Sequence, residues 1–191
     1  RGGNLCFNWG NKTEYYYHKC YHCGFASNGA RTKYEAKLKW NECVENAKKN
    51  LPAAYQGMGL RCAAAAMKLQ KPEEKDAKFA EALSFLTKAQ AKAKAYNQTR
   101  ALATALAAAG KIYQAQGGGY YNSGNFAKAI EVFSKGYAAD KRNTDIAMML
   151  AESYFKSDKY NEGVQVCSEV AALPSPKYDA AKAKAQATMN Q

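Results

Sequence analysis

The sequence predicts an all-α fold: an α-solenoid of antiparallel helix pairs, preceded by an extended N-terminal arm rich in aromatic residues and cysteine. From about Thr32 the chain is rich in Ala, Lys, Leu and Glu and keeps a helical period nearly to its end. Short turn signals divide that pattern, and one stretch recurs 34 residues later. Residues 1–30 lack the period and hold three cysteines. We therefore predict two domains, an arm over 1–30 and a helical domain over 31–191.

The helices are delimited by proline and by short polar turns. Asn50 and Pro52 predict a break between one helix at about 32–49 and the next at about 52–69, because proline suits a first helical turn. Pro72, followed by acidic residues, begins another helix, and a long helix is expected from about 98 to 121. The stretches NSGN (122–125) and KSDK (156–159) are turns. The stretch LPSP (173–176) precedes a capping helix over 177–190.

The repeated stretch carries most of the information on fold. YYNSGNFAKAIEVF begins at Tyr120, and YFKSDKYNEGVQVC begins at Tyr154 with the same spacing of apolar and small residues. The pattern resembles the tetratricopeptide (TPR) repeat, a 34-residue unit of two antiparallel helices. The resemblance implies repeats at about 110–143 and 144–176. It places Gly117 and Ala129 where the helix backbones approach each other, with Phe133 beside them.

A TPR-like solenoid is expected to bind other proteins along a groove lined by the first helix of each pair. The repeat positions that face this groove come from both units. The candidate partner-binding residues are Lys111, Gln114, Tyr121, Asn122, Asp145, Met148, Glu152, Phe155 and Lys156.

Catalysis is not expected, and neither is a cofactor or a small-molecule substrate. Both histidines, His18 and His22, lie in the arm, the carboxylates are scattered, and no glycine-rich phosphate loop is followed by Lys-Ser or Lys-Thr. No apolar run is long enough to span a membrane. The net charge is +12, concentrated in the N-terminal half. A basic face of this kind can meet nucleic acid, but a solvated lysine surface is the preferred interpretation, so nucleic-acid binding is an alternative.

The cysteines of the arm admit two interpretations. Gly24 follows Cys23, which excludes covalent haem attachment. A zinc site using Cys20 and Cys23 stays open, although a structural site needs four ligands. We prefer disulfides and no metal, because a chain that begins at Arg1 has the look of a processed, exported protein, and exported cysteines meet an oxidising compartment. Cys167 is expected to be a buried thiol. The disulfide candidates, with undetermined connectivity, are Cys6, Cys20, Cys23, Cys43 and Cys62.

Two asparagines, Asn11 and Asn97, fit the N-glycosylation pattern and are compatible with export.

The arm has too many aromatic residues for a free linker, since disordered segments are poor in them. It can dock on its own helices or on a neighbouring copy, and we favour the neighbour. The sequence thus predicts an exported, self-assembling structural subunit of filament type, with copies of itself as partner. A periplasmic or extracellular adaptor for another protein is the alternative. The arm residues expected to make contacts are Phe7, Trp9, Tyr15, Tyr16, Tyr17, Tyr21 and Phe25.

Overall fold

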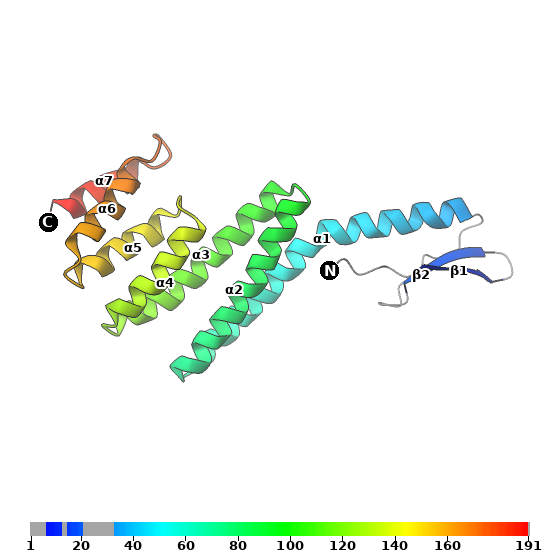
Figure 1. Cartoon of the computed structure of the whole chain (residues 1–191), viewed down its shortest axis with the longest axis horizontal. Helices are drawn as coiled ribbons and strands as arrows, with labels where there is room; N and C mark the ends of the chain where they lie inside the picture. The colour runs from blue at the N-terminus through cyan, green and yellow to red at the C-terminus, as the bar shows by residue number, and fades with distance from the viewer. Residues whose placement is uncertain (1–6, 13–14, 21–32, 191) are drawn as a thin grey trace. The chain divides into compact units, whose positions relative to one another are not determined.

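The computed structural model describes the backbone of residues 7–12, 15–20 and 33–190, and the side chains of residue 35 and residues 37–190. The chain divides into two compact units, Arg1–Leu51 and Pro52–Gln191 (Figure 1). The division falls after residue 51, inside a helix, whereas the sequence predicted a boundary near residue 30. Each unit is therefore described by itself.

The N-terminal unit contains a β-hairpin. Strands β1 (Phe7–Lys12) and β2 (Tyr15–Cys20) pair antiparallel, with Phe7 opposite Cys20 and Lys12 opposite Tyr15. Aromatic residues such as the tyrosines of β2 favour strands. Five of the predicted arm contacts lie on these strands, whereas Tyr21 and Phe25 lie outside the described residues. The side chains of the strands are outside the described part as well.

Helix α1 (Lys33–Lys68) runs without interruption through Pro52, so the predicted break at Asn50 and Pro52 is wrong. Proline inside a helix removes one backbone hydrogen bond and crowds the preceding turn. Here the residues next to Pro52, Leu51 and Ala53, are good helix formers, and the Pro52 side chain is fully buried. The expected helix from about 52 to 69 therefore exists, as the second half of α1.

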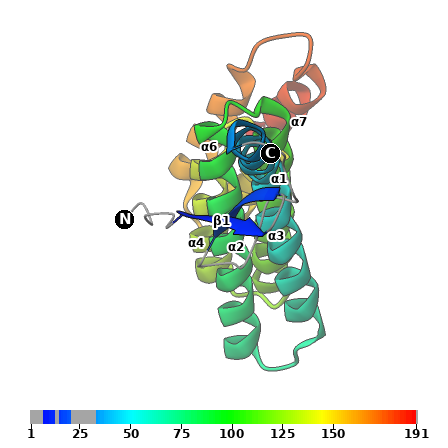
Figure 2. The ribbon, with the colours of Figure 1, turned by 90° about the vertical axis from the view of Figure 1, so that its right-hand side faces the viewer.

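Six further helices follow in the unit that begins at Pro52, and each packs against the next in sequence order (Figure 1). Helix α3 also contacts α5, as the first helices of successive repeats do. Figure 2 shows α2 and α3 running side by side along the vertical direction of that view. The helix pairs expected at about 110–143 and 144–176 correspond to α3 with α4 and to α5 with α6, and α7 lies where the capping helix was expected. The bounds are α2 (Pro72–Ala95), α3 (Thr99–Asn122), α4 (Phe126–Ala139), α5 (Thr144–Phe155), α6 (Tyr160–Ala171) and α7 (Asp179–Met189).

The turns explain where these helices begin. The side-chain oxygens of Asn125 and Asn143 accept hydrogen bonds from the backbone N–H of Lys128 and Ile146, which caps α4 and α5. Gly124, in the turn before α4, has a φ of 76°, a left-handed conformation that glycine adopts without a steric penalty.

The core of this unit forms where the repeat predicted it. Phe133 and Cys167 are fully buried in one cluster, with Tyr120 and Tyr154 packed against it. The ring of Phe133 lies against Gly117, and a Cβ built on that glycine would be 2.5 Å from the ring. The small residue therefore lets α4 approach α3 closely, as the resemblance implied. A second cluster, around Phe79 and Leu86, joins the second half of α1 to α2 and α3.

Candidate functional site

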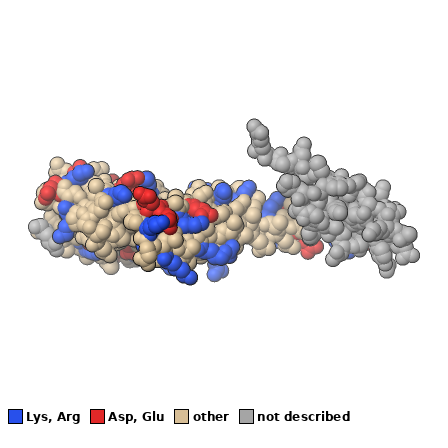
Figure 3. Space-filling view, turned by 90° about the horizontal axis from the view of Figure 1, so that it is seen from below, with Lys and Arg blue, Asp and Glu red and all other residues tan. Residues whose placement is uncertain are grey.

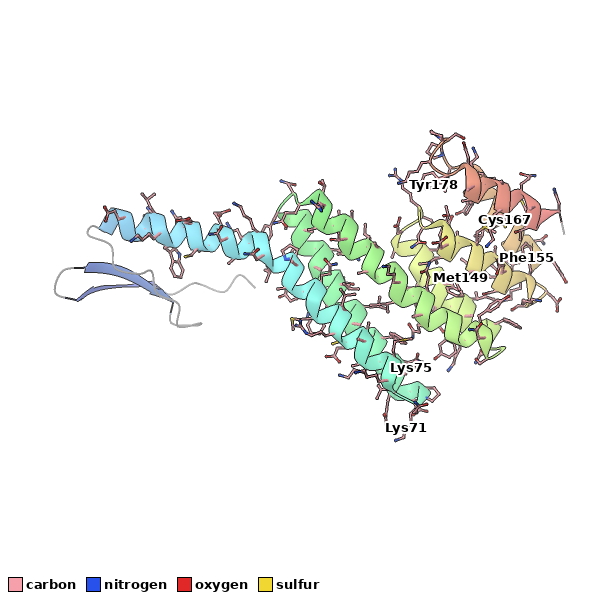
Figure 4. All side chains as sticks on the ribbon, turned by 180° about the vertical axis from the view of Figure 1, so that it is seen from behind. Lys71, Lys75, Met149, Phe155, Cys167 and Tyr178 are labelled. Carbon is pink, nitrogen blue, oxygen red and sulfur yellow. The ribbon has the colours of Figure 1, made fainter. Side chains whose placement is uncertain are left out.

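An open groove of about 610 Å³ lies where α5, α6 and α7 meet the end of α3. Four residues predicted to face a partner line it: Tyr121 from α3, and Glu152, Phe155 and Lys156 from the end of α5. Figure 4 labels Phe155 on this C-terminal group of helices. The remaining lining residues are Tyr160, Val164, Lys184, Ala187, Thr188 and Met189.

An aromatic pair occurs in both repeats, and three of its four rings, those of Tyr121, Phe155 and Tyr160, line the groove. Tyr121 and Phe126 meet edge to face with ring centroids 5.3 Å apart, and Phe155 and Tyr160 occupy the equivalent places one repeat later with centroids 6.3 Å apart. Phe155 is held in position by Gly163, because a Cβ built there would be 2.6 Å from its ring. The positions of the Phe155 and Tyr160 rings therefore depend on Gly163 and on the length of the turn between α5 and α6.

The rim of the groove is charged. Lys184 on α7 reaches Glu152 on α5, with Nζ 3.4 Å from Oε1, and both side chains remain substantially exposed. Lys156, which is also exposed, completes this side. An exposed ion pair of this kind adds little stability. The groove thus combines apolar walls with a polar edge, which is the usual composition of a surface that binds a protein segment.

The other candidate groove residues are placed elsewhere. Lys111, Asn122 and Asp145 are exposed and Gln114 is half-buried, but none of them lines this groove. Met148 is 3% exposed and belongs to the core, so this position does not present its side chain to a partner. The helical register explains the difference, since α5 directs Met148 toward the neighbouring helices.

Sequence reasoning missed the part of the groove that α6 and α7 supply. Tyr160 aligns with Phe126 of the previous repeat and is not among the predicted partner-binding residues, yet it is 59% exposed. Residues 177–190 were recognised as a cap. The sequence could have indicated this part of the groove, because a capping helix must pack beside the last repeat. The residues of the cap that face the repeat, Met189 among them, therefore border the groove.

Two tyrosine hydroxyls on other faces bind carboxylates. Tyr120 donates to Asp76 of α2, and Gln116 Nε2 donates to the same side chain at 2.8 Å. Burial, followed by this hydrogen bond, raises the pKa of Tyr120 to about 12. Tyr137 donates to Glu169 at 2.7 Å, and burial followed by this bond raises the Tyr137 pKa. A tyrosine held protonated in this way links helices and is no general base near neutral pH.

The described cysteines are thiols. Cys43 and Cys62 are free and half-buried, and Cys167 is free and fully buried, which confirms the thiol predicted there. Burial raises the pKa of Cys167. The predicted disulfides to Cys43 and Cys62 are therefore not formed in this structure. Cys6 and Cys23, and the side chain of Cys20, lie outside the described residues.

Other features bear on metals, membranes and glycans. Among the side chains that the structure describes, no three His, Cys, Asp or Glu groups converge on a metal position. None of the described helices is both long and apolar enough to cross a membrane. Asn97 is exposed in the turn between α2 and α3, and the side chain of Asn11 is not described. Glycosylation of either residue stays a prediction.

Comparison with known proteins supports the repeat. The family model for the tetratricopeptide repeat matches residues 120–185, which include α4 to α6, the end of α3 and most of α7. No curated protein and no solved structure matches the chain. The matched segment holds both repeated aromatic pairs and seven of the ten residues that line the groove. Residues 120–185 of this chain are therefore a tetratricopeptide-repeat region.

Proposed function

We propose that the chain is a non-enzymatic, exported subunit that associates with copies of itself through its arm and its helical domain. The tetratricopeptide region itself indicates a role in protein–protein interaction. The observation that carries the proposal is the apolar groove at the α5–α7 end, lined by half-exposed Tyr121, Phe155 and Met189 and by exposed Tyr160 and Val164. Such a surface gains stability when another chain covers it.

The arm supports a partner that is a second copy. A neighbouring chain brings an N-terminal arm with five aromatic residues on β1 and β2, and aromatic side chains contribute most to protein interfaces. In this proposal the arm docks on the helical domain of the neighbour. Repeated head to tail, such a contact does not close and yields a filament.

The test compares the full chain with a chain that begins at Thr32, by light scattering over a range of concentrations. The proposal expects the full chain to form large assemblies and the shortened chain, still helical by circular dichroism, to form smaller ones. A matched control keeps the arm length and replaces Phe7 and Trp9 by serine, which should also reduce assembly. An unchanged assembly state in both variants would make the arm an intramolecular brace.

Two further outcomes separate the alternatives. A full chain that stays monomeric but captures one defined protein from its own cell envelope favours the adaptor. Binding to an oligonucleotide that weakens steeply with salt favours the nucleic-acid alternative. Export itself is tested by cell fractionation with an antibody against the chain, and recovery in the cytoplasm alone overturns that part of the proposal.

A further inference from the structure

The helical unit that begins at Pro52 carries its positive charge mainly in its first half. Residues 52–122 hold ten cations against four carboxylates, whereas residues 123–190 hold nine cations against eight carboxylates. The stretch of α1 from Pro52 to Lys68 and the whole of α3 contain no carboxylate. On the face drawn in Figure 3, wide uncharged areas lie between the Lys and Arg side chains. The first half of the unit is therefore the part to search for an anionic partner.

The second half of α1 contributes an apolar row flanked by cations. Exposed apolar residues recur there at intervals of seven, four and three residues, which aligns them on one side of the helix. Two of them are large, Leu60 at 45% and Met67 at 57% exposure. The residue directly after each is an exposed cation, Arg61 or Lys68. The row consists of Ala53, Leu60, Ala64 and Met67.

Helix α3 lies beside the second half of α1. Thr104 Oγ1 on α3 donates to Gln56 Oε1 on α1 at 3.3 Å. Ala66 of α1 belongs to the same core cluster as Ala108 and Ile112 of α3. On the side of α3 that carries Thr104, helical spacing aligns exposed residues that are small or basic. They are Arg100, Ala103, Ala107 and Lys111.

Together the two rows form a surface that we call the basic face. Helices α2, α4 and α5 all adjoin α3 and hold seven carboxylates, of which five are paired with other side chains. The two that remain, Glu73 and Asp145, are exposed. Among the ion pairs between described residues, none includes a cation of this face. The face thus keeps a net positive charge, and its large and charged members are Leu60, Arg61, Met67, Lys68, Arg100 and Lys111.

Three classes of anionic partner compete for such a face: nucleic acid, an anionic membrane and an acidic protein segment. Nucleic-acid binding without sequence preference relies on exposed aromatic rings for stacking, but the aromatic residue of residues 52–68 and 99–111, Tyr55, is half-buried. Helices that lie on a membrane insert bulky residues such as Leu, Phe and Trp, whereas this face has two large apolar side chains among alanines. An acidic protein segment fits best, because its apolar residues cover the row and its carboxylates meet the cations.

We propose that the basic face binds a segment of another protein in which Asp and Glu flank apolar residues. Leu60 and Met67 contact the apolar residues of that segment, while the cations of α1 and α3 pair with its carboxylates. The arm of a second copy lacks this chemistry, because residues 1–30 hold three cations and one carboxylate. The partner is therefore a different protein, and the inference goes beyond the self-association proposed above.

The test measures the binding of a labelled synthetic peptide to the full chain by fluorescence anisotropy. The peptide has leucine at every third and fourth position and glutamate between them. A second peptide replaces each glutamate by glutamine. The glutamate peptide should bind more tightly by roughly tenfold or more, and its affinity should fall as salt is raised.

Two full-length variants locate the binding surface. Arg61→Glu with Lys111→Glu reverses one cation on each helix, and Leu60→Ser with Met67→Ser removes the large apolar groups. Each variant should weaken binding of the glutamate peptide by roughly tenfold or more. The charge variant should also lose most of the salt dependence, whereas the serine variant should keep it.

Lys128→Glu with Lys177→Glu is the matched control for charge. Both lysines are exposed, lie outside the basic face, and change the net charge by the same amount when replaced. This variant should bind the glutamate peptide as the wild type does. All the side chains replaced in the three variants are exposed, so helical circular dichroism should be retained.

The contrary outcomes are distinct. A wild-type chain that binds neither peptide, or binds both equally, overturns the proposal. An equal loss in the charge variant and in its control makes the attraction a property of the net charge and also overturns it. Tighter binding of an oligothymidylate or of phosphatidylserine vesicles than of the peptide, abolished in the charge variant, assigns the face to nucleic acid or lipid instead. Each of these results leaves the self-association proposal standing, because light scattering tests that separately.

Discussion

Replacing Gly117 by alanine tests how closely α3 and α4 pack. The added Cβ would lie 2.5 Å from Cε1 of Phe133 and 2.7 Å from two further ring atoms. Real Cβ atoms keep about 3.5–4.0 Å from such carbons. Gly117 is buried and Phe133 is 0% exposed, so the ring has no free space into which it can move. We therefore expect Gly117→Ala to strain the core.

The magnitude follows from two opposing effects. Overpacking a core in this way costs roughly 1–3 kcal/mol. Alanine in place of glycine within a helix stabilises by about 1 kcal/mol. Gly119→Ala provides the matched control, because Gly119 lies on the same helix, is exposed, and has nothing within 4 Å of a built Cβ. Since the helix-propensity gain is common to both variants, Gly117→Ala should be less stable than Gly119→Ala by roughly 1–3 kcal/mol.

The assay is urea unfolding followed by helical circular dichroism, with the midpoint and the slope fitted for each variant. Gly119→Ala should unfold at higher urea than the wild type and Gly117→Ala at lower urea than Gly119→Ala, with equal slopes. Adding Phe133→Leu to Gly117→Ala should recover part of the loss, because a smaller side chain makes room, and a double-mutant cycle measures this coupling. Equal stability of the two alanine variants would refute the close packing of Gly117 on Phe133.

Three further predictions concern the same helices. Phe133→Ala should lower the free energy of unfolding by about 3–5 kcal/mol, measured in urea, because the ring is fully buried. The pKa of Tyr120 is raised to about 12 in the fold, against about 10 when unfolded. The stability it contributes is therefore complete below about pH 10 and lost as pH rises toward 12, and Tyr120→Phe should show less alkaline loss in urea melts. Asp158 has a φ of 58°, so Asp158→Gly should raise the free energy of unfolding by up to about 1 kcal/mol and raise the thermal midpoint slightly. Gly124→Ala should lower both.

The C-terminal part of the fold was predictable because each repeat encodes its own contacts locally. A positive φ in the turn, at Gly124 and again at Asp158, lets the following N–H bond back to the carbonyl of Tyr120 or Tyr154, at 2.9 and 3.0 Å. The turn residue, the aromatic ring after it and the small residue in the second helix are all close in sequence. A comparison of the chain with itself therefore detects them.

The predicted helix break at Pro52 was wrong because its outcome depends on contacts that are distant in sequence. A proline with a preceding asparagine is a sound local signal for a helix start, but whether a helix continues through it depends on packing. Pro52 is fully buried in the unit to which α2 and α3 belong. The sequence next to Pro52 does not reveal this tertiary environment. The rule that proline begins a helix therefore predicted two helices where α1 is a single helix.

The groove was only partly predictable for a related reason. Of the predicted residues, Tyr121, Glu152, Phe155 and Lys156 line the groove, because successive first helices present equivalent residues to one side. The same reasoning was wrong at Met148, which is buried, because residues at equivalent repeat positions can differ in solvent exposure. The side of α5 that faces its neighbours is set by the packing of three helices, which one helix's own sequence does not specify.

The end of the repeat array shows how one repeat position can be packed in one unit and exposed in the next. Phe126 is half-buried, and one repeat later the equivalent Tyr160 is 59% exposed at the edge of the groove. Its hydroxyl donates to Asp158 at 3.0 Å, while its ring stays against Phe155. A tyrosine tolerates water at one end and offers an apolar body at the other. Tyr160 therefore keeps its hydroxyl hydrogen-bonded at the exposed side while its ring forms part of the groove edge.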